Sequence, residues 1–490
     1  MNRRMILSLL GNVLLLIGAF LLLPCIVALL YGETDALLAL LYTLGICTAV
    51  GVGLSALRPR HDRSLHPKDG FVMVALSWIL ISLLGALPFY FSGMIPSYLD
   101  AVFETVSGFT TTGASILSAV EELPHALLFW RSFTHWLGGM GVLVFMLAIV
   151  PMSGESIYLL RAESPGPSVS KMVPKMRTSA AILYLIYCAM TVLQILLYQL
   201  GNWLGWGEIS LFDSLCLAFG TAGTGGFAVR NDGLASYAVY TQAVTTVFMI
   251  LFGVNFSVYF FLLRGKFKLA WKNSELRCYL FVILTAIALV TVNVLLTGGY
   301  FDTVGDAVHH VSFSVGSIIT TTGFGTTDFA RWPELSKVIL ALLMIIGACA
   351  GSTGGGIKVS RLMILVKTAR AEVRHLLHPH SVEVMTMDGK RVQPDVVRGT
   401  SAFIIVYILI AVISIGLVAL DNFGTETTLT AVFATLNNIG PGLSREIGPF
   451  GNYGGFSALS KLVLIADMLF GRLELFPMLI LLRPSTWRKH

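Results

Sequence analysis

The chain has 490 residues, of which 55% are hydrophobic and only 12% are charged, and its mean hydropathy is +0.79. A soluble globular protein carries about 25% charged residues, so these proportions exclude a water-soluble fold and predict a membrane protein. The formal net charge of +6 comes from short basic clusters beside apolar segments, which suits anchoring to the inner membrane leaflet, and no nucleic-acid partner is expected.

Apolar segments long enough to cross a membrane recur along the chain. The first five lie at 5–31, 36–57, 71–91, 127–152 and 180–200. The first is too long for the apolar part of a signal peptide and lacks a small-residue cleavage site, so we expect it to be a retained helix. The six cysteines lie singly, so neither a disulfide nor a zinc site is expected.

Basic clusters alternate with the apolar segments and predict the orientation of the chain. Most of the 33 lysine and arginine residues lie at 3–4, 58–68, 161–177, 264–277, 361–398 and 483–489. By the positive-inside rule these clusters, and both termini, are expected in the cytoplasm. Ten spanning helices fit this alternation: two at the start, followed by four pairs whose members are joined on the outer side.

The outer connection within each of the four pairs contains a short apolar segment. These segments lie at 99–109, 208–222, 302–319 and 428–437. They are too short to cross a membrane, and irregular backbone at membrane depth is tolerated only inside protein or along a wet cavity. We therefore expect four re-entrant half-helices around a central pathway.

Each half-helix leads into a similar glycine-containing run, which indicates a fourfold internal repeat. The runs are Ser107-Gly-Phe-Thr-Thr-Thr-Gly113, Thr221-Ala-Gly-Thr-Gly-Gly226, Ile319-Thr-Thr-Thr-Gly323 and Asn437-Asn-Ile-Gly440. Counting from a shared Ala-Val-Phe would instead place Leu443 opposite Gly113, so the register of the fourth run stays open. A single such run is usually an outer loop or a helix-packing site, but four at matched positions favour a common pathway.

Four extended backbones that meet on one axis can replace the water shell of a cation with carbonyl oxygens. Glycine permits the positive φ that turns successive carbonyls inward, and the C-termini of the half-helices add partial negative charge. Neutral carbonyls without a carboxylate ring suit a monovalent alkali cation better than Ca²⁺ or Mg²⁺.

On these motifs the sequence resembles the TrkH family of the Trk/Ktr/HKT superfamily of potassium transporters. The resemblance implies a pseudo-tetrameric pore in a bacterial inner membrane, a homodimer, and a cytoplasmic nucleotide-binding regulatory subunit of the TrkA type. It implies K⁺ as the transported ion, with Rb⁺ and Na⁺ as further candidates, and no bound organic cofactor. The filter residues that it implies are Thr111, Thr112, Gly113, Thr224, Gly225, Gly226, Thr321, Thr322, Gly323, Asn438, Ile439 and Gly440.

A glycine-rich break interrupts the second helix of the third repeat, around 346–358. Several glycines in a row cannot hold a helix, since each costs about 1 kcal/mol relative to alanine. The resemblance implies an intramembrane gating loop, and close helix packing through small residues is the alternative. The gating residues expected here are Gly347, Gly351, Gly354, Gly355, Gly356 and Lys358.

Arg472 lies within the last apolar segment, at 458–482, where a cation is costly and usually functional. Asp467 and Glu474 lie at offsets of five and two, which do not face Arg472 on a helix. We expect Arg472 to project into the conduction path beneath the filter and to act in gating. The alternative is an interhelical ion pair that holds the bundle together.

The expected fold is an all-α polytopic membrane protein with four tandem helix–pore loop–helix repeats in a pseudo-fourfold arrangement and two N-terminal transmembrane helices. The expected units are the N-terminal hairpin at 1–66 and the repeats at 67–178, 179–274, 275–394 and 395–490. In the cytoplasmic link before the fourth repeat, Asp388-Gly389 predicts a β-hairpin that could dock a regulatory subunit.

The predicted function is potassium uptake through a carbonyl-lined filter that a glycine-rich loop gates. A Na⁺- or H⁺-coupled secondary transporter is the alternative, although such folds tend to have inverted repeats. An intramembrane enzyme would need paired acids at membrane depth, where only Asp467 and Glu474 are available. The chain is therefore not expected to be an enzyme.

Overall fold

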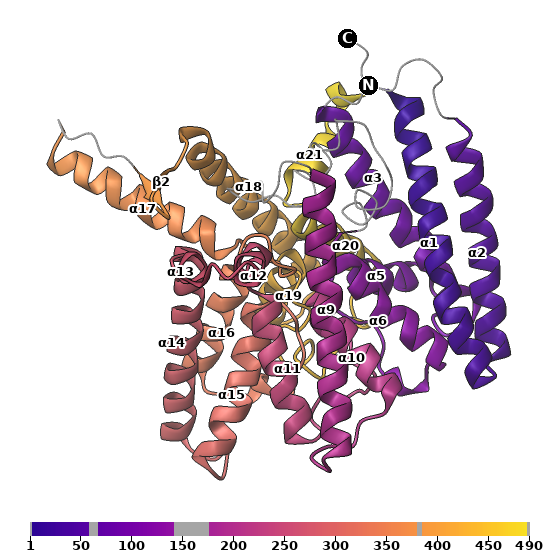
Figure 1. Cartoon of the computed structure of the whole chain (residues 1–490), viewed down its shortest axis with the longest axis horizontal. Helices are drawn as coiled ribbons and strands as arrows, with labels where there is room; N and C mark the ends of the chain where they lie inside the picture. The colour runs from indigo at the N-terminus through magenta and orange to yellow at the C-terminus, as the bar shows by residue number, and fades with distance from the viewer. Residues whose placement is uncertain (1, 58–66, 142–175, 380–384, 488–490) are drawn as a thin grey trace.

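The computed structural model describes residues 2–57, 67–141, 176–379 and 385–487, and these form an almost entirely helical body (Figure 1). Six helices of the described chain are long and apolar enough to cross a membrane, and a bent pair raises the number to seven. The protein is therefore an all-helical, multi-pass membrane protein. The long helices are α1 (Arg3–Tyr31), α2 (Thr34–Ser55), α3 (Pro67–Gly85), which continues into α4 (Leu87–Phe91), α9 (Met176–Trp203), α14 (Ser274–Thr297) and α18 (Pro394–Val418).

Four shorter helices lie where the short apolar segments predict half-helices: α5 (Tyr98–Phe109), α10 (Leu211–Gly223), α15 (Val304–Ile319) and α19 (Thr425–Leu436). The first three begin in the same way. The side-chain oxygens of Ser97, Ser210 and Thr303 each accept a hydrogen bond from the backbone N–H three residues later. This cap satisfies an N–H group that a helix start leaves without a partner, so local sequence defines where these helices begin.

The helix that follows each half-helix is interrupted or short, whereas the sequence led us to expect an interruption in the third repeat alone. These elements are α6 (His125–Gly139), α11 (Val239–Phe252) with α12 (Phe256–Leu263), α16 (Glu334–Ile346) with α17 (Val359–Leu377), and α20 (Ala458–Arg472) with α21 (Phe476–Leu482).

Of these interruptions, only the break between α16 and α17 was predicted. The break between α11 and α12 is sharp, because the two helices are bent by 93° relative to each other. The predicted segment at 127–152 continues past α6 into residues outside the described chain. Crowding gives the physical reason, because these helices run against the ends of half-helices. A side chain at Gly138 would collide with the Phe109 carbonyl, and one at Gly471 with the Leu436 carbonyl.

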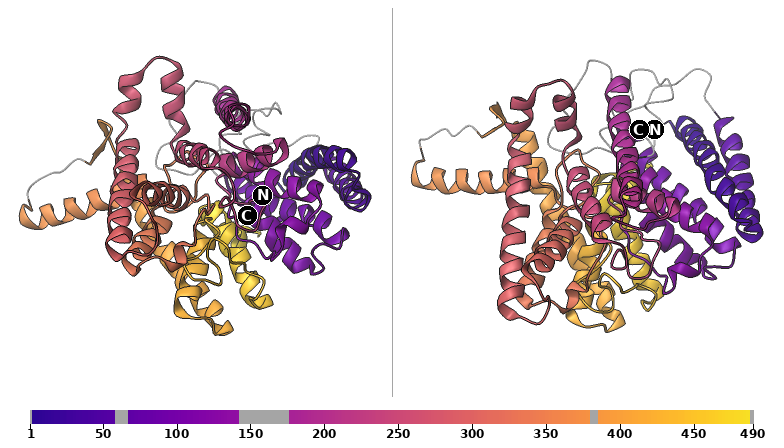
Figure 2. Two further views of the ribbon diagram at one scale, coloured as in Figure 1. Left: turned by 90° about the horizontal axis from the view of Figure 1, so that it is seen from below. Right: turned by 60° about the horizontal axis from the view of Figure 1, so that its bottom comes forward.

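The helices pack in a closed cycle. Each half-helix packs between the two helices that flank it in sequence. In addition, α6 contacts α10, α11 contacts α15, α16 contacts α19, and α20 returns to α5. The helices α1 and α2 lie outside this cycle, at one side of the body, where α1 packs on α3 and α6 (Figures 1 and 2).

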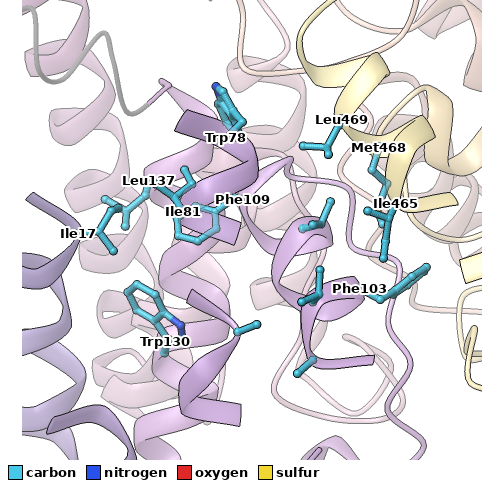
Figure 3. Close-up of a cluster of buried hydrophobic side chains, with 14 of the residues drawn as sticks. Ile17, Trp78, Ile81, Phe103, Phe109, Trp130, Leu137, Ile465, Met468 and Leu469 are labelled. Atoms are coloured by element: carbon cyan, nitrogen blue, oxygen red, sulfur yellow. The ribbon is translucent and has the colours of Figure 1, made fainter. Parts of the chain in front are cut away.

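The half-helices are buried in apolar side chains. Around α5, residues from α1, α3, α6 and α20 surround Phe103 and Phe109, including Trp78, Trp130 and Met468 (Figure 3). A helix that is hydrophobic on most sides is stable only inside a large apolar core, so α5 is held by tertiary packing and not by its own length.

Short elements connect the helices: η1 (Val120–Glu122), α13 (Phe267–Trp271), η2 (Phe329–Arg331), η3 (Ala419–Asp421), η4 (Pro484–Thr486), and the strands β1 (Thr386–Met387) and β2 (Lys390–Arg391). The strands confirm the predicted hairpin, with Asp388 and Gly389 both at positive φ in its turn. The hairpin and the two ends of the described chain lie at the same end of the body (Figure 1). There, Arg3 Nη2 donates to the Trp487 carbonyl at 3.0 Å.

Candidate functional site

The four glycine runs meet in a closed ring. A side chain at Gly113 would collide with the carbonyl oxygen of Gly225, and one at Gly226 with that of Thr322. One at Gly323 would collide with the Ile439 carbonyl, and one at Gly440 would press on the Thr112 carbonyl. Each loop therefore touches the next, and the fourth returns to the first. The structure brings together all four predicted runs, which lie far apart in the sequence.

The four loops also share one backbone conformation. The N–H groups of Thr112, Gly225, Thr322 and Ile439 each donate to the carbonyl five residues earlier, at 2.8–2.9 Å. The N–H groups of Thr111, Thr224, Thr321 and Asn438 each donate to the carbonyl three residues earlier, at 3.0–3.1 Å. This is the Schellman pattern that ends a helix. In this shared pattern Gly440, and not Leu443, occupies the position equivalent to Gly113.

The loops hold unusual residues at positive φ. A Schellman ending normally places glycine at the left-handed position, but here Thr111, Thr224 and Thr321 have φ of 55°, 54° and 58°. A β-branched residue in this region is a genuine outlier and costs about 1–3 kcal/mol. Such strain persists only where the surroundings hold it and clusters at functional sites. In the fourth loop Asn438, at φ 55°, is a residue type that tolerates this conformation better.

Pockets lie on both sides of the ring. One is lined by Gly113, Gly226, Gly323 and Gly440 together with residues that follow them. The other is lined by Asn438, which precedes Gly440, and by residues of the α16–α17 loop and the end of α20. The C-termini of the four half-helices end at the ring and place partial negative charge there, which favours a cation.

Part of the predicted gating loop lies directly against the ring. The α16–α17 loop covers residues 347–358, and Gly355 donates its N–H to Thr321 Oγ1 at 2.6 Å. Gly356 donates its N–H to the Asn437 carbonyl at 3.1 Å. A side chain at Gly355 would collide with that same carbonyl, so only glycine fits this approach.

Further contacts fix the other side of this loop. Cys349 donates its N–H to the Gly253 carbonyl at 3.1 Å, and the Gly351 carbonyl accepts from the N–H of Phe256 at 3.0 Å. These two hydrogen bonds connect the loop to the break between α11 and α12. Within the loop, Lys358 Nζ donates to the Gly354 carbonyl, and Gly347, with φ of 72°, ends α16.

Glu275 holds both ends of the same loop. Its side chain is 4% exposed, and Oε1 accepts the N–H of Ala350 at 2.7 Å and that of Ser360 at 3.2 Å. The sequence pattern does not single out Glu275, because an acid in the first turn of a helix beside a basic cluster resembles ordinary helix capping.

Arg472 contacts three elements on the side of the ring that the α16–α17 loop covers. Its Nη1 donates to Thr111 Oγ1 at 3.2 Å and to the Thr353 carbonyl of the α16–α17 loop at 3.0 Å. Its Nη2 donates to the carbonyls of Gly138 and Gly139 at the end of α6. Arg472 therefore contacts the first glycine loop and the α16–α17 loop at the same time.

The two acids considered beside Arg472 have other partners. Glu474 pairs with Arg361 of α17, and Asp467 accepts a hydrogen bond from Ser414 of α18 at 2.7 Å. In the described part of the chain, Arg472 itself donates hydrogen bonds to the ring, to the α16–α17 loop and to the end of α6.

Polar side chains behind the ring were also missed by sequence analysis. His135 of α6 donates from Nδ1 to the Gly108 carbonyl at 2.7 Å and accepts the Phe227 N–H on Nε2 at 3.1 Å. Tyr453 donates its hydroxyl to the Gly440 carbonyl at 2.7 Å. One sequence feature could have indicated these residues: Arg131 and His135 lie four residues apart in an apolar segment and so share one helix face. Polar groups in a membrane helix usually face the protein interior.

Comparison with known proteins agrees with this architecture. A family described as a cation transport protein, TrkH, matches residues 39–489. The Trk system potassium uptake protein TrkH of Salmonella typhimurium is 35% identical, and that of Vibrio parahaemolyticus is 36% identical, each over 100% of both chains. The crystal structure of the potassium transporter TrkH from Vibrio parahaemolyticus matches with a TM-score of 0.87 and 33% identity, again over 100% of both chains.

Both the sequence match and the structural match extend over the full length. The chain therefore belongs to the TrkH family of cation transport proteins, which are transporters and not enzymes.

Proposed function

We propose that the protein is a potassium-uptake subunit that conducts K⁺ through the ring of four glycine loops. The observation that carries the proposal is the closed cycle in which each filter glycine touches a carbonyl of the next loop. Relatives that match over the full length are named potassium uptake proteins. A ring of carbonyl oxygens can replace the hydration shell of K⁺.

The proposed ligands are the backbone carbonyls that precede each glycine. In each loop the filter glycine and the residue two positions before it have positive φ, and the residue between them does not. This alternation of handedness turns successive carbonyls toward the same side, where an ion can meet several of them. The coordinating positions are Thr111 and Thr112, Thr224 and Gly225, Thr321 and Thr322, and Asn438 and Ile439.

The proposal extends from the ring to the whole pore. We propose four repeats at 67–178, 179–274, 275–394 and 395–490 around a pseudo-fourfold axis, with 1–66 as an outer hairpin. The cyclic packing of the half-helices supports this division. Because the hairpin and both ends of the described chain lie at the same end of the body, we assign that end to the cytoplasm of a bacterial inner membrane (Figure 1).

The loop at 347–358 is proposed as the gate. It contacts the third and fourth filter loops, and Arg472 bridges it to the first. A positive charge below the filter repels an arriving cation, so the arrangement described is non-conducting. Opening would require the loop to leave the ring. We propose that a nucleotide-binding subunit of the TrkA type, docked on the cytoplasmic side of a homodimer, drives this change.

The test is Rb⁺ or K⁺ flux into liposomes that contain the purified protein, with and without the change Gly113→Asp. The added side chain collides with the Gly225 carbonyl, so flux should fall or lose selectivity. Gly299→Asp is the matched control, because Gly299 also has positive φ but no atom lies within 4 Å of the added Cβ. Flux and selectivity unaltered by Gly113→Asp would remove the filter assignment.

A further inference from the structure

A buried ion pair lies immediately behind the first two filter loops. Arg131 Nε of α6 lies 2.6 Å from Glu104 Oε1 of α5, and the two side chains are 3% and 0% exposed. At the equivalent position, nine residues before the filter glycine, the other three repeats carry Leu217, Ser314 and Ala431. The carboxylate is therefore a feature of the first repeat only.

The acid of this pair holds the first loop just past Gly113. Glu104 Oε2 accepts the N–H of Ile116 at 2.9 Å, and Oε1 accepts the hydroxyl of Ser115 at 2.9 Å. Hydrogen bonds to a carboxylate are shorter and stronger than those between neutral groups. The backbone that leaves the first filter loop is thus tied to its own half-helix.

The base of the pair holds the second loop just past Gly226. Arg131 Nη1 donates to the Ala228 carbonyl at 2.9 Å, and the guanidinium lies 3.5 Å from the centre of the Phe227 ring. One planar guanidinium therefore contacts Glu104 and the second loop at the same time. It can do so because its N–H donors point in several fixed directions.

The same network continues to the fourth loop. The Ser115 carbonyl accepts the N–H of Tyr453 at 2.8 Å, and the Tyr453 hydroxyl donates to the Gly440 carbonyl at 2.7 Å. The pair thus lies at the centre of connections among three of the four filter loops. Glu104, Arg131 and Tyr453 are buried, whereas Ser115, Ile116 and Ala228 are half-buried. The low dielectric around the buried groups strengthens their hydrogen bonds.

We propose that the Glu104–Arg131 pair is a selectivity determinant, which holds the outer ends of the first and second filter loops at the spacing that suits K⁺ and resists their contraction around Na⁺. The proposal rests on the proposed conduction of K⁺. Carbonyls that can move inward satisfy a smaller ion as well, so cross-linked loops favour the larger one. Glu104 and Arg131 are positioning residues, because they act through the backbone of Ser115, Ile116 and Ala228.

Stability and selectivity can be separated at this pair. Replacement of a buried ion pair by apolar residues of similar volume is often neutral for stability, whereas removal of one partner leaves a buried charge. The double variant Glu104→Leu with Arg131→Met therefore removes the cross-link without leaving a charge. Arg131→Lys keeps the charge near Glu104, but a single ammonium cannot reproduce the fork that also binds Ala228.

The experiment measures the Na⁺ to K⁺ permeability ratio of purified, reconstituted protein, together with its melting temperature in KCl and in NaCl. We expect the double variant and Arg131→Lys to raise the ratio at least about fivefold, which corresponds to loss of one ordinary hydrogen bond. The extra stabilisation by K⁺ over Na⁺ should shrink in parallel. A purely structural role would lower the melting temperature in both salts and leave the ratio unchanged.

The matched control is Lys461→Gln. Lys461 Nζ lies 2.6 Å from Asp100 Oδ1, so this change also removes an ion pair to α5, and we expect no change in the permeability ratio. Absence of K⁺ flux both in the wild type and in Gly355→Ala, which displaces the gating loop, would refute the proposed function instead. The proposal for the pair would be overturned if the wild type is selective for K⁺ and Arg131→Lys has the same Na⁺ to K⁺ permeability ratio as the wild type. The same result is then expected in the double variant.

Discussion

Replacement of Arg472 by alanine tests the proposed gate most directly. The change removes a guanidinium that donates to Thr111 Oγ1, to the Thr353 carbonyl and to the end of α6. Of these contacts, the one to Thr353 joins α20 to the gating loop, so it opposes movement of the loop away from the ring. The change also removes a positive charge from the proposed ion path.

The size of the effect follows from that one bond. A hydrogen bond from a charged donor contributes about 1.5–3 kcal/mol. Because the bond is made only in the closed state, its loss raises the ratio of open to closed protein by about 10- to 150-fold, since about 1.4 kcal/mol corresponds to a factor of ten. Flux should rise by the same factor until the open state dominates. Loss of the repelling charge acts in the same direction.

The assay is Rb⁺ influx into liposomes without any regulatory subunit, normalised to the amount of folded protein. Arg472→Lys should give a smaller rise, since it keeps the charge but loses the fork of donors. Arg398→Ala serves as the control, because that side chain is 80% exposed and pairs with Asp395. Flux in Arg472→Ala at or below the wild-type level, with an unchanged melting temperature, would refute the gating role.

Three further changes probe the loop and the ring. Glu275→Ala removes the acceptor for two backbone N–H groups at the ends of the gating loop and should raise basal Rb⁺ influx with the Na⁺ to K⁺ ratio unchanged; a lower flux would contradict this. Gly355→Ala places a methyl group against the Asn437 carbonyl, which should displace the loop and increase influx. Unchanged influx would indicate that the loop does not obstruct the pore. Tyr453→Phe removes a bond to the Gly440 carbonyl that contributes about 1 kcal/mol, and a K⁺ titration of the melting temperature should show weaker stabilisation.

Several features of the fold could be predicted because they depend on local chemistry. The lengths of apolar segments indicated both the long helices and the four half-helices, since crossing a membrane sets a minimum length. Asp388-Gly389 predicted the hairpin turn, and the glycines after Ile346 predicted the end of α16. In each case the property belongs to residues that are neighbours in the chain.

The interruptions of the other second helices were not predictable in the same way. The segments at 239–263 and 458–482 are apolar enough to read as continuous spans. They break because they meet the ends of half-helices, and close approach at Gly471 leaves no room for a side chain beside the Leu436 carbonyl. Neighbours from other parts of the chain impose this crowding.

The amino-acid sequence alone determined that the protein crosses a membrane, where its long helices and half-helices lie, and that four glycine runs repeat, because hydropathy and backbone freedom are properties of short segments. Only the tertiary structure decided which carbonyl each glycine touches, which residue of the fourth run matches Gly113, and that Glu275, Tyr453 and the Glu104–Arg131 pair support the site. The physical reason is that a buried polar group is defined by its partners, and these partners lie up to hundreds of residues away in the chain.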